Sequence, residues 1–191
     1  MKRKIRNGCF ETNSSSTHAI CISKENYTKR NFIKFEIGEF GWEFKIYDDL
    51  NSRASYLITA IFSLDINVAD EKLQQLKDIL DDNNIEYDIP TPEIKSYTYG
   101  EETEYYYDID GYIDHVRETD TFVNAVLSDS NKLMRYLFGN SLIITGNDNE
   151  YDYEDQMYIK EDDEITKWGV FPRYGEMKPE FNNYEIYEKG N

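Results

Sequence analysis

The stretch SRASYLITAIFSL, residues 52–64, decides the fold class, because here the apolar residues change from alternating to helical spacing. One stripe of the predicted helix carries Tyr56, Leu57, Ala60, Ile61 and Leu64. A second helix is predicted from about Val68 to Asp82, with Asn83 and Asn84 at its end. Two consecutive helices, in a chain whose other segments alternate apolar and polar residues as strands do, predict an α+β protein.

Alternating segments lie on both sides of these helices. Residues 31–37 and 42–46 carry apolar side chains at every second position, with Gly38 and Gly41 between them. This pattern predicts a hairpin with one buried face. Further strands are predicted at residues 19–22, 85–89, 142–144, 157–159 and 184–187.

The second half of the chain continues the mixture of strands and helices. Two strands are predicted between residues 97 and 120 around Asp110-Gly111, a dipeptide that favours hairpin turns. Residues 145–149 have the composition of a turn. Two more helices are predicted, one capped by Asp120 or Thr121 and running to Leu127, the other capped by Ser130 and running to Phe138.

The sequence as a whole predicts a single compact α+β domain over residues 1–191. We expect a mixed or antiparallel sheet with about four helices. The polar segment 6–18 would pack at the edge of this domain, and residues 97–191 would form its acidic C-terminal part.

The composition indicates a folded, intracellular protein. The chain has 17 Tyr, 10 Phe and 2 Trp, whereas a disordered chain of this charge would be poor in aromatic residues. Cys9 and Cys21 are too few for a disulfide scaffold and lack the spacing of a zinc site. No apolar run approaches the roughly 18 residues of a membrane span, so we expect no membrane contact.

The charge is distributed unevenly. Residues 1–60 carry 10 Lys/Arg and 7 Asp/Glu, a net charge of +3, whereas residues 61–191 carry 11 and 31, a net charge of −20. Because affinity for nucleic acid depends on Lys and Arg, we expect no direct binding to free DNA. A basic surface, such as that of a nucleic-acid-binding protein or ribonucleoprotein, is the expected partner. The acidity is equally consistent with a role in solubility alone.

The polar run FETNSSSTH, residues 10–18, is the first candidate site. Small hydroxyl residues favour turns and helix caps, and the free N–H groups of such a turn can also bind a phosphate. The candidate ligand-binding residues are Asn13, Ser14, Ser16, Asn147 and Asp148.

The two histidines, His18 and His115, are candidates for an acid–base pair. Such a pair can cleave RNA without a metal, because one imidazole deprotonates the 2′-hydroxyl while the other protonates the leaving oxygen. Glu11 and Asp114 would support these histidines, and Ser15 is a candidate nucleophile. The alternative is that both histidines are unrelated surface or capping residues.

The sequence predicts neither a metal nor a cofactor. Asp108-Ile109-Asp110-Gly111 resembles a calcium loop, but its glycine comes too early and Thr119 stands where a carboxylate is required. Asp148, Glu150 and Asp152 could hold Mg²⁺ or Ca²⁺, but alternation along an exposed strand explains these carboxylates equally well.

An acidic stretch rich in tyrosine is the candidate surface for a partner. Carboxylates spaced along it imitate the phosphates of a nucleic acid, and the tyrosines between them add flat contact area. The candidate partner-binding residues are Glu101, Glu102, Glu104, Tyr106, Asp108 and Asp110.

The run at residues 10–18 resembles the opening of a family of phage and mobile-element proteins that have no assigned activity. Members share two later motifs, which stand here in the same order as YIDH (residues 112–115) and ITGNDN (residues 144–149). This chain departs from the pattern at Cys9, Ala19, Val116 and Arg117, where the family has Val, Ser, Gln and Ser.

The resemblance implies an accessory protein in the cytoplasm of a bacterial host. By analogy with anti-CRISPR proteins, we expect an inhibitor whose acidic surface occupies a basic groove of a host nucleic-acid-handling complex. The alternative is an enzyme that cleaves RNA or modifies a nucleotide with His18 and His115, acting on guide RNA that such a complex holds.

Overall fold

A four-stranded antiparallel sheet forms the centre of the fold. The computed structural model describes residues 16–114, 119–147, 152–161, 164–166, 169–171 and 173–189. The strand order in the sheet is β14-β1-β9-β4. These strands are β1 (Ser16–Ser23), β4 (Lys45–Tyr47), β9 (Leu142–Asn147) and β14 (Tyr184–Lys189).

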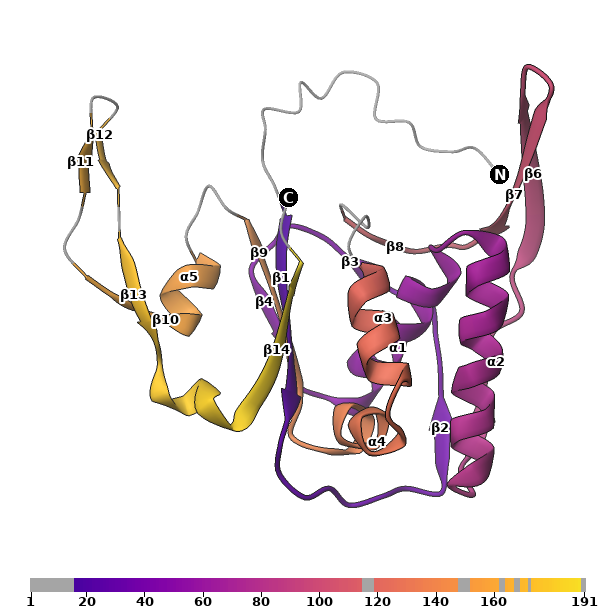
Figure 1. The fold of residues 1–191 in the computed structure, drawn as a ribbon, viewed down its shortest axis with the longest axis horizontal. Helices are drawn as coiled ribbons and strands as arrows, with labels where there is room; N and C mark the ends of the chain where they lie inside the picture. The colour runs from indigo at the N-terminus through magenta and orange to yellow at the C-terminus, as the bar shows by residue number, and fades with distance from the viewer. Residues whose placement is uncertain are drawn as a thin grey trace.

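Helices cover one face of this sheet and a smaller layer covers the other. Figure 1 shows α1, α3 and α4 along the first face, with α2 outside them, and α5 beside the second face. The helices are α1 (Leu50–Phe62), α2 (Ile66–Asp82), α3 (Thr119–Leu127), α4 (Ser130–Phe138) and α5 (Asp152–Met157). On this side the chain continues with β10 (Tyr158–Lys160), β11 (Glu164–Thr166), β12 (Gly169–Phe171), β13 (Tyr174–Met177) and a 3-10 helix, Pro179–Asn183. The β11–β12 pair projects away from the central sheet (Figure 1).

Strand β1 is buried on both faces. Ile20 and Ile22 pack into the large core beneath the helices. Cys21, between them, points the other way and packs in the second cluster with Met157 and Phe181. A strand covered on both sides has no face toward solvent, which explains the continuous apolar run at residues 19–22.

The predicted α+β class is confirmed, and all four predicted helices are present. Helix α3 begins at Thr119, so its predicted caps, Asp120 or Thr121, lie inside the helix instead. Helix α1 begins after Asp49, whose side chain accepts a hydrogen bond from the Ser52 amide. Asn83 caps the end of α2 and is followed by Asn84 with φ of 53°, a left-handed conformation that asparagine tolerates. Asp129 caps α4, one residue before the predicted Ser130.

The predicted hairpin over residues 31–46 is wrong. Strand β2 (Phe32–Lys34) pairs in parallel with β5 (Glu86–Asp88), and β3 (Glu39–Phe40) pairs in parallel with β8 (Tyr112–Ile113). Strand β4 instead joins the central sheet beside β9. Alternation fixes which side chains share a face, but it does not select the partner strand.

The apolar face predicted for residues 42–46 is also not covered. Trp42, Phe44 and Ile46 are each 40–44% exposed. Ile46 lies in β4, which ends the strand order of the central sheet, and the other two lie in the segment just before it. The alternation of these residues is therefore real, but it marks a half-exposed edge rather than one face of a hairpin.

The hairpin predicted around Asp110-Gly111 is wrong as well. The structure instead forms a hairpin from β6 (Glu93–Tyr99) and β7 (Glu102–Asp108), and its turn contains Gly100 with φ of 65°. Gly111 serves a different purpose, because a Cβ there would lie 2.4 Å from the carbonyl oxygen of Gly38. The glycine thus permits close packing of two chain segments.

The turn predicted from residue 145 begins too early. Strand β9 continues to Asn147, because Gly146 and Asn147 pair with Thr17 and Ser16 of β1. Those partners belong to the polar run at residues 10–18, for which the sequence predicts a position at the edge of the fold. Its described part, Ser16–His18, lies in an inner strand of the central sheet.

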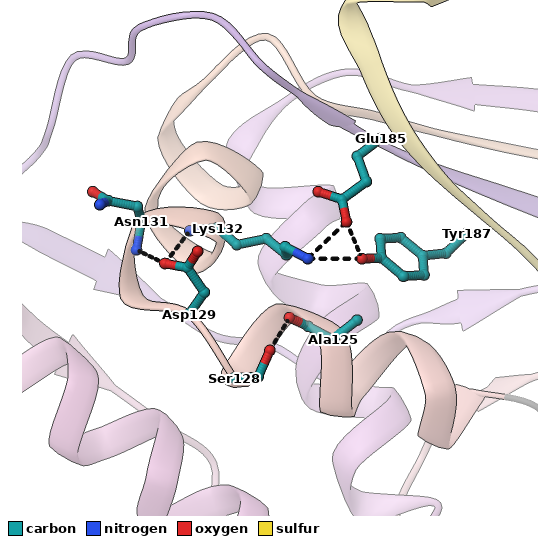
Figure 2. A network of polar contacts seen from close by, with 7 residues as sticks. All are labelled: Ala125, Ser128, Asp129, Asn131, Lys132, Glu185 and Tyr187. Atoms are coloured by element: carbon teal, nitrogen blue, oxygen red, sulfur yellow. Dashed lines mark hydrogen bonds and ion pairs between the residues drawn. The ribbon is translucent and has the colours of Figure 1, made fainter.

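A polar network joins α4 to β14. Lys132 donates to the Glu185 carboxylate at 2.7 Å and to the Tyr187 hydroxyl at 2.8 Å, as Figure 2 shows. Burial opposes ionisation of Glu185, but hydrogen bonds from Lys132 and Tyr187 outweigh it and lower the pKa of Glu185. The hydrogen bond to Glu185 raises the pKa of Lys132, so this ion pair is fully charged near neutral pH.

Replacing Lys132 with methionine should lower the free energy of unfolding by about 1–2 kcal/mol near neutral pH. Its side chain is only 16% exposed, so the substitution leaves Glu185 without its cation. The pKa of Glu185 is lowered by folding, so its ionised form stabilises the fold above the unfolded pKa, near 4.3, and this contribution is lost as the pH falls through the folded pKa. Urea unfolding at a series of pH values should show the difference shrinking in acid.

The Lys34→Met variant is the matched control, because Lys34 and Glu36 form an ion pair whose side chains are 54% and 65% exposed. It should change the stability by less than about 0.5 kcal/mol. Equal effects of the two substitutions would contradict a stabilising role for the Lys132 network.

Candidate functional site

Four buried polar residues lie at one end of the central sheet, on the face that packs against α1. Ser16 is opposite Asn147 and His18 is opposite Thr145 in the pairing of β1 with β9. Each of the four is at most 4% exposed. Because they occupy the same face as Ile20, they extend the large core as a polar cluster.

Both ring nitrogens of His18 have partners inside the protein. Nδ1 lies 3.0 Å from the Tyr56 hydroxyl, and Nε2 lies 3.0 Å from the Gly41 carbonyl oxygen. A carbonyl oxygen only accepts, so Nε2 carries the proton. Nδ1 then accepts from Tyr56, whose pKa is raised by complete burial so that the hydroxyl keeps its proton.

Two other members of the polar cluster, Ser16 and Thr145, donate to neighbouring backbone. Ser16 donates through Oγ to the carbonyl oxygen of Asp114 at 3.1 Å. Thr145 donates through Oγ1 to the carbonyl oxygen of Glu43 at 2.7 Å. The Asp114 amide donates in turn to the carbonyl oxygen of Phe40 at 2.8 Å. These bonds fix β3, β8 and the segment before β4 against the central sheet.

The structure therefore brings together parts of all three sequence motifs. Ser16 and His18 come from the first motif, Asp114 from the second and Asn147 from the third. Six other predicted site residues lie outside the described part of the chain: Glu11, Asn13, Ser14, Ser15, His115 and Asp148. Their catalytic and ligand-binding roles stay predictions.

The surroundings of His18 differ from both sequence interpretations. The interpretation of His18 as a surface or capping residue is wrong, because its side chain is fully buried. As a general acid or base it would have to present a nitrogen to a substrate, and both nitrogens face Tyr56 and Gly41 instead. In this arrangement His18 positions the core helix α1 against the central sheet.

Among the described residues, no group of three or more His, Cys, Asp or Glu side chains is arranged to hold a metal ion. Cys21 is buried, and burial raises the pKa of its thiol to about 12, which keeps it in the unreactive thiol form. In the part of the chain that the structure describes, no helix is both long and apolar enough to cross a membrane.

The acidic stretch forms a second candidate site on the β6–β7 hairpin. We call one side of this hairpin the acidic hairpin face. It comprises Glu93, Lys95, Tyr97 and Tyr99 on β6 and Glu102, Glu104, Tyr106 and Asp108 on β7. Figure 1 shows the hairpin extending beyond the end of α2, away from the central sheet.

The opposite side of the hairpin holds it to the body of the protein. The Tyr107 ring packs edge-on against Phe62 with 4.9 Å between centroids, and its hydroxyl donates to Asp70 of α2. The root of the hairpin is thereby fixed to both α1 and α2. The acidic hairpin face points away from these contacts, because side chains alternate along a strand.

Five of the six predicted partner-binding residues lie on this hairpin. Glu102, Glu104, Tyr106 and Asp108 share the acidic hairpin face, and Glu101 lies in the turn. Asp110 lies beyond β7 and is not part of the hairpin. The sequence pattern did not single out Tyr97 and Tyr99, although they follow the same alternation on β6.

Comparisons with known proteins add no assignment to either site. No protein-family model, curated protein or solved structure matches this chain.

Proposed function

We propose that the chain is an accessory protein of a phage or mobile element that inhibits a host nucleic-acid-handling complex, such as a CRISPR effector. The acidic hairpin face would occupy a basic groove of that complex. The observation that carries this proposal is the position of the face: it projects from the body and combines carboxylates with exposed tyrosines.

The charge of the hairpin tip supports the proposal. Glu101, Glu102 and Glu104 are exposed and make no ion pair with any other described residue, so their charges remain uncompensated. A local excess of negative charge attracts a basic surface over several ångströms and accelerates association. The net charge of −17 adds to this attraction and repels free nucleic acid.

Reversing the charge at the tip should impair capture of the partner. With Glu101, Glu102 and Glu104 replaced by lysine, we expect association to slow by about tenfold to a hundredfold. The measurement is a pull-down from a bacterial lysate at low and high salt, followed by binding kinetics on the recovered complex. The wild-type chain should lose its partner as salt rises, because screening weakens exposed charges.

The matched control reverses three exposed acids outside the hairpin, Asp82, Glu86 and Glu180, and so makes the same change in net charge. It should slow association far less than the tip variant. Equal effects of the two triple variants on the association rate would contradict docking through the acidic hairpin face. Recovery of the partner that does not change with salt concentration would contradict it as well.

An RNA-cleaving or nucleotide-modifying enzyme is a second candidate function, favoured by the meeting of Ser16, Asp114 and Asn147. The surroundings of His18 count against its proposed role as an acid or base. Recovery of a complex whose RNA is shortened by the wild-type chain, and full-length with the His115→Ala variant, would favour the enzyme.

A further inference from the structure

The tip of the acidic hairpin face consists of two matching rungs. Tyr99 is directly opposite Glu102, and Tyr97 is directly opposite Glu104. Each rung therefore joins one carboxylate on β7 to one phenol ring on β6. Residues two apart on an antiparallel strand are about 7 Å apart, so the rungs repeat the same pair of groups at a short, regular distance.

The rings of both rungs are presented to solvent. Tyr99 is 85% exposed and Tyr97 is 54% exposed. The Tyr97 hydroxyl donates to Glu104 within its rung, and its ring lies 6.4 Å from that of Tyr106 at an angle of 54°. These contacts orient Tyr97 without covering it, so its ring can stack against an incoming group.

The charge is concentrated at the same two rungs. Farther along the face, Lys95 forms an ion pair with Asp108 and neutralises it. Glu102 and Glu104 have no such cation among the described residues. The two most exposed tyrosines of the face therefore stand directly opposite carboxylates that no described cation pairs with.

A carboxylate beside an open aromatic ring reproduces the two groups of one nucleotide in a single strand. In a duplex the base faces are stacked inside, and proteins contact phosphates and base edges. Sites for single strands combine a positive groove with aromatic platforms on which successive bases stack. Exposed tyrosine rings therefore imitate the unstacked bases of a single strand, and a duplex presents no comparable group.

Resting on the proposed function, we infer that the groove occupied by the hairpin is one that binds single-stranded nucleic acid. The rungs Tyr99–Glu102 and Tyr97–Glu104 take the place of two consecutive nucleotides. Their carboxylates meet the cations that track the strand, and their rings take the stacking positions of two bases.

Competition for the captured complex tests this inference. The wild-type chain is immobilised, loaded from a bacterial lysate at low salt, and eluted with oligo(dT) or with duplex DNA of equal phosphate number. Oligo(dT) should release the complex at a concentration about tenfold or more below that of the duplex. Equal release by the two, or better release by the duplex, would overturn the single-strand assignment and leave the proposed function standing.

Matched tyrosine variants give the second readout. The double variant Tyr97→Ser and Tyr99→Ser should bind the recovered complex about tenfold or more weakly, because each lost stacking contact has a large effect. Tyr105→Ser is the control, since Tyr105 is 57% exposed but lies on the opposite side of the hairpin. Wild-type affinity of the double variant would overturn the inference.

Failure of the proposed function gives a different result. If the wild-type chain captures nothing in a salt-dependent manner, or if the lysine variant at the hairpin tip captures as much as the wild type, then both the proposed function and the inference fail. If the variant without Tyr97 and Tyr99 still captures the complex in a salt-dependent manner with wild-type affinity, the inference fails and the proposed function stands.

Discussion

Replacing Arg53 with methionine should lower the free energy of unfolding by about 3–5 kcal/mol. The Arg53 guanidinium is buried between α1, α4 and the start of β9, with 4% of the residue exposed. It donates to the carbonyl oxygens of Ser141 at 2.6 Å, Leu137 at 2.8 Å and Gly139 at 3.0 Å, and also to that of Asp48. One side chain therefore satisfies four backbone acceptors.

The acceptors explain the size of the effect. The last carbonyl groups of a helix have no partner within the helix and carry partial negative charge, so Arg53 caps the end of α4. Burial lowers the pKa of Arg53, but a guanidinium keeps its proton under all ordinary conditions. Methionine fills part of the space and removes the guanidinium donor from all four oxygens, three of which are bound in buried contacts.

Two further variants separate capping from charge. Arg53→Lys keeps the charge, but a single ammonium cannot reach all four oxygens, so it should recover only part of the loss. Arg173→Met removes an exposed arginine and should change stability by less than about 0.5 kcal/mol. Urea unfolding measures all three, and a near-neutral Arg53→Met variant would refute the capping role.

The helices were predictable because their signals are local. Helix α1 follows from its apolar stripe, and its start from Asp49 three residues before Ser52. Strand partners depend on segments far away in the chain. The partner of β2 is β5, which follows both α1 and α2, and alternation within β2 contains no information about that choice.

The candidate site was predictable only in part for a similar reason. The sequence motifs indicated that residues near Ser16, Asp114 and Asn147 belong together, and these three do meet. The burial of His18 was missed because the polar run around it resembles a surface turn. Two signals were present: His18 alternates with Ile20, and the Tyr56 hydroxyl, on the buried stripe of a helix, requires a partner.

Replacing His18 with alanine should lower the free energy of unfolding by about 2–4 kcal/mol. The substitution leaves a cavity and removes the partners of the Tyr56 hydroxyl and the Gly41 carbonyl, both of which His18 contacts at 3.0 Å. An unpartnered buried polar group is costly because it also loses its hydrogen bonds to water. Urea unfolding of the variant measures the loss.

Tyr56→Phe provides a matched test of the same contact. It removes only the hydroxyl and should cost about 1 kcal/mol. Because His18 and Tyr56 share one hydrogen bond, the effects of the two substitutions should not add, and the double variant should be more stable than their sum implies. Strict additivity would show that the contact between the two side chains does not stabilise the fold.

The His18 variants also decide between the two functions considered for this chain. An acid–base role predicts that His18→Ala abolishes turnover while the fold keeps its stability. A structural role predicts that His18→Ala lowers the free energy of unfolding, whether or not the wild-type chain cleaves any RNA. One result would overturn the structural role and support a catalytic one. The His18→Ala variant would have to be fully stable and leave the RNA of a captured complex intact, while the wild-type chain shortens that RNA.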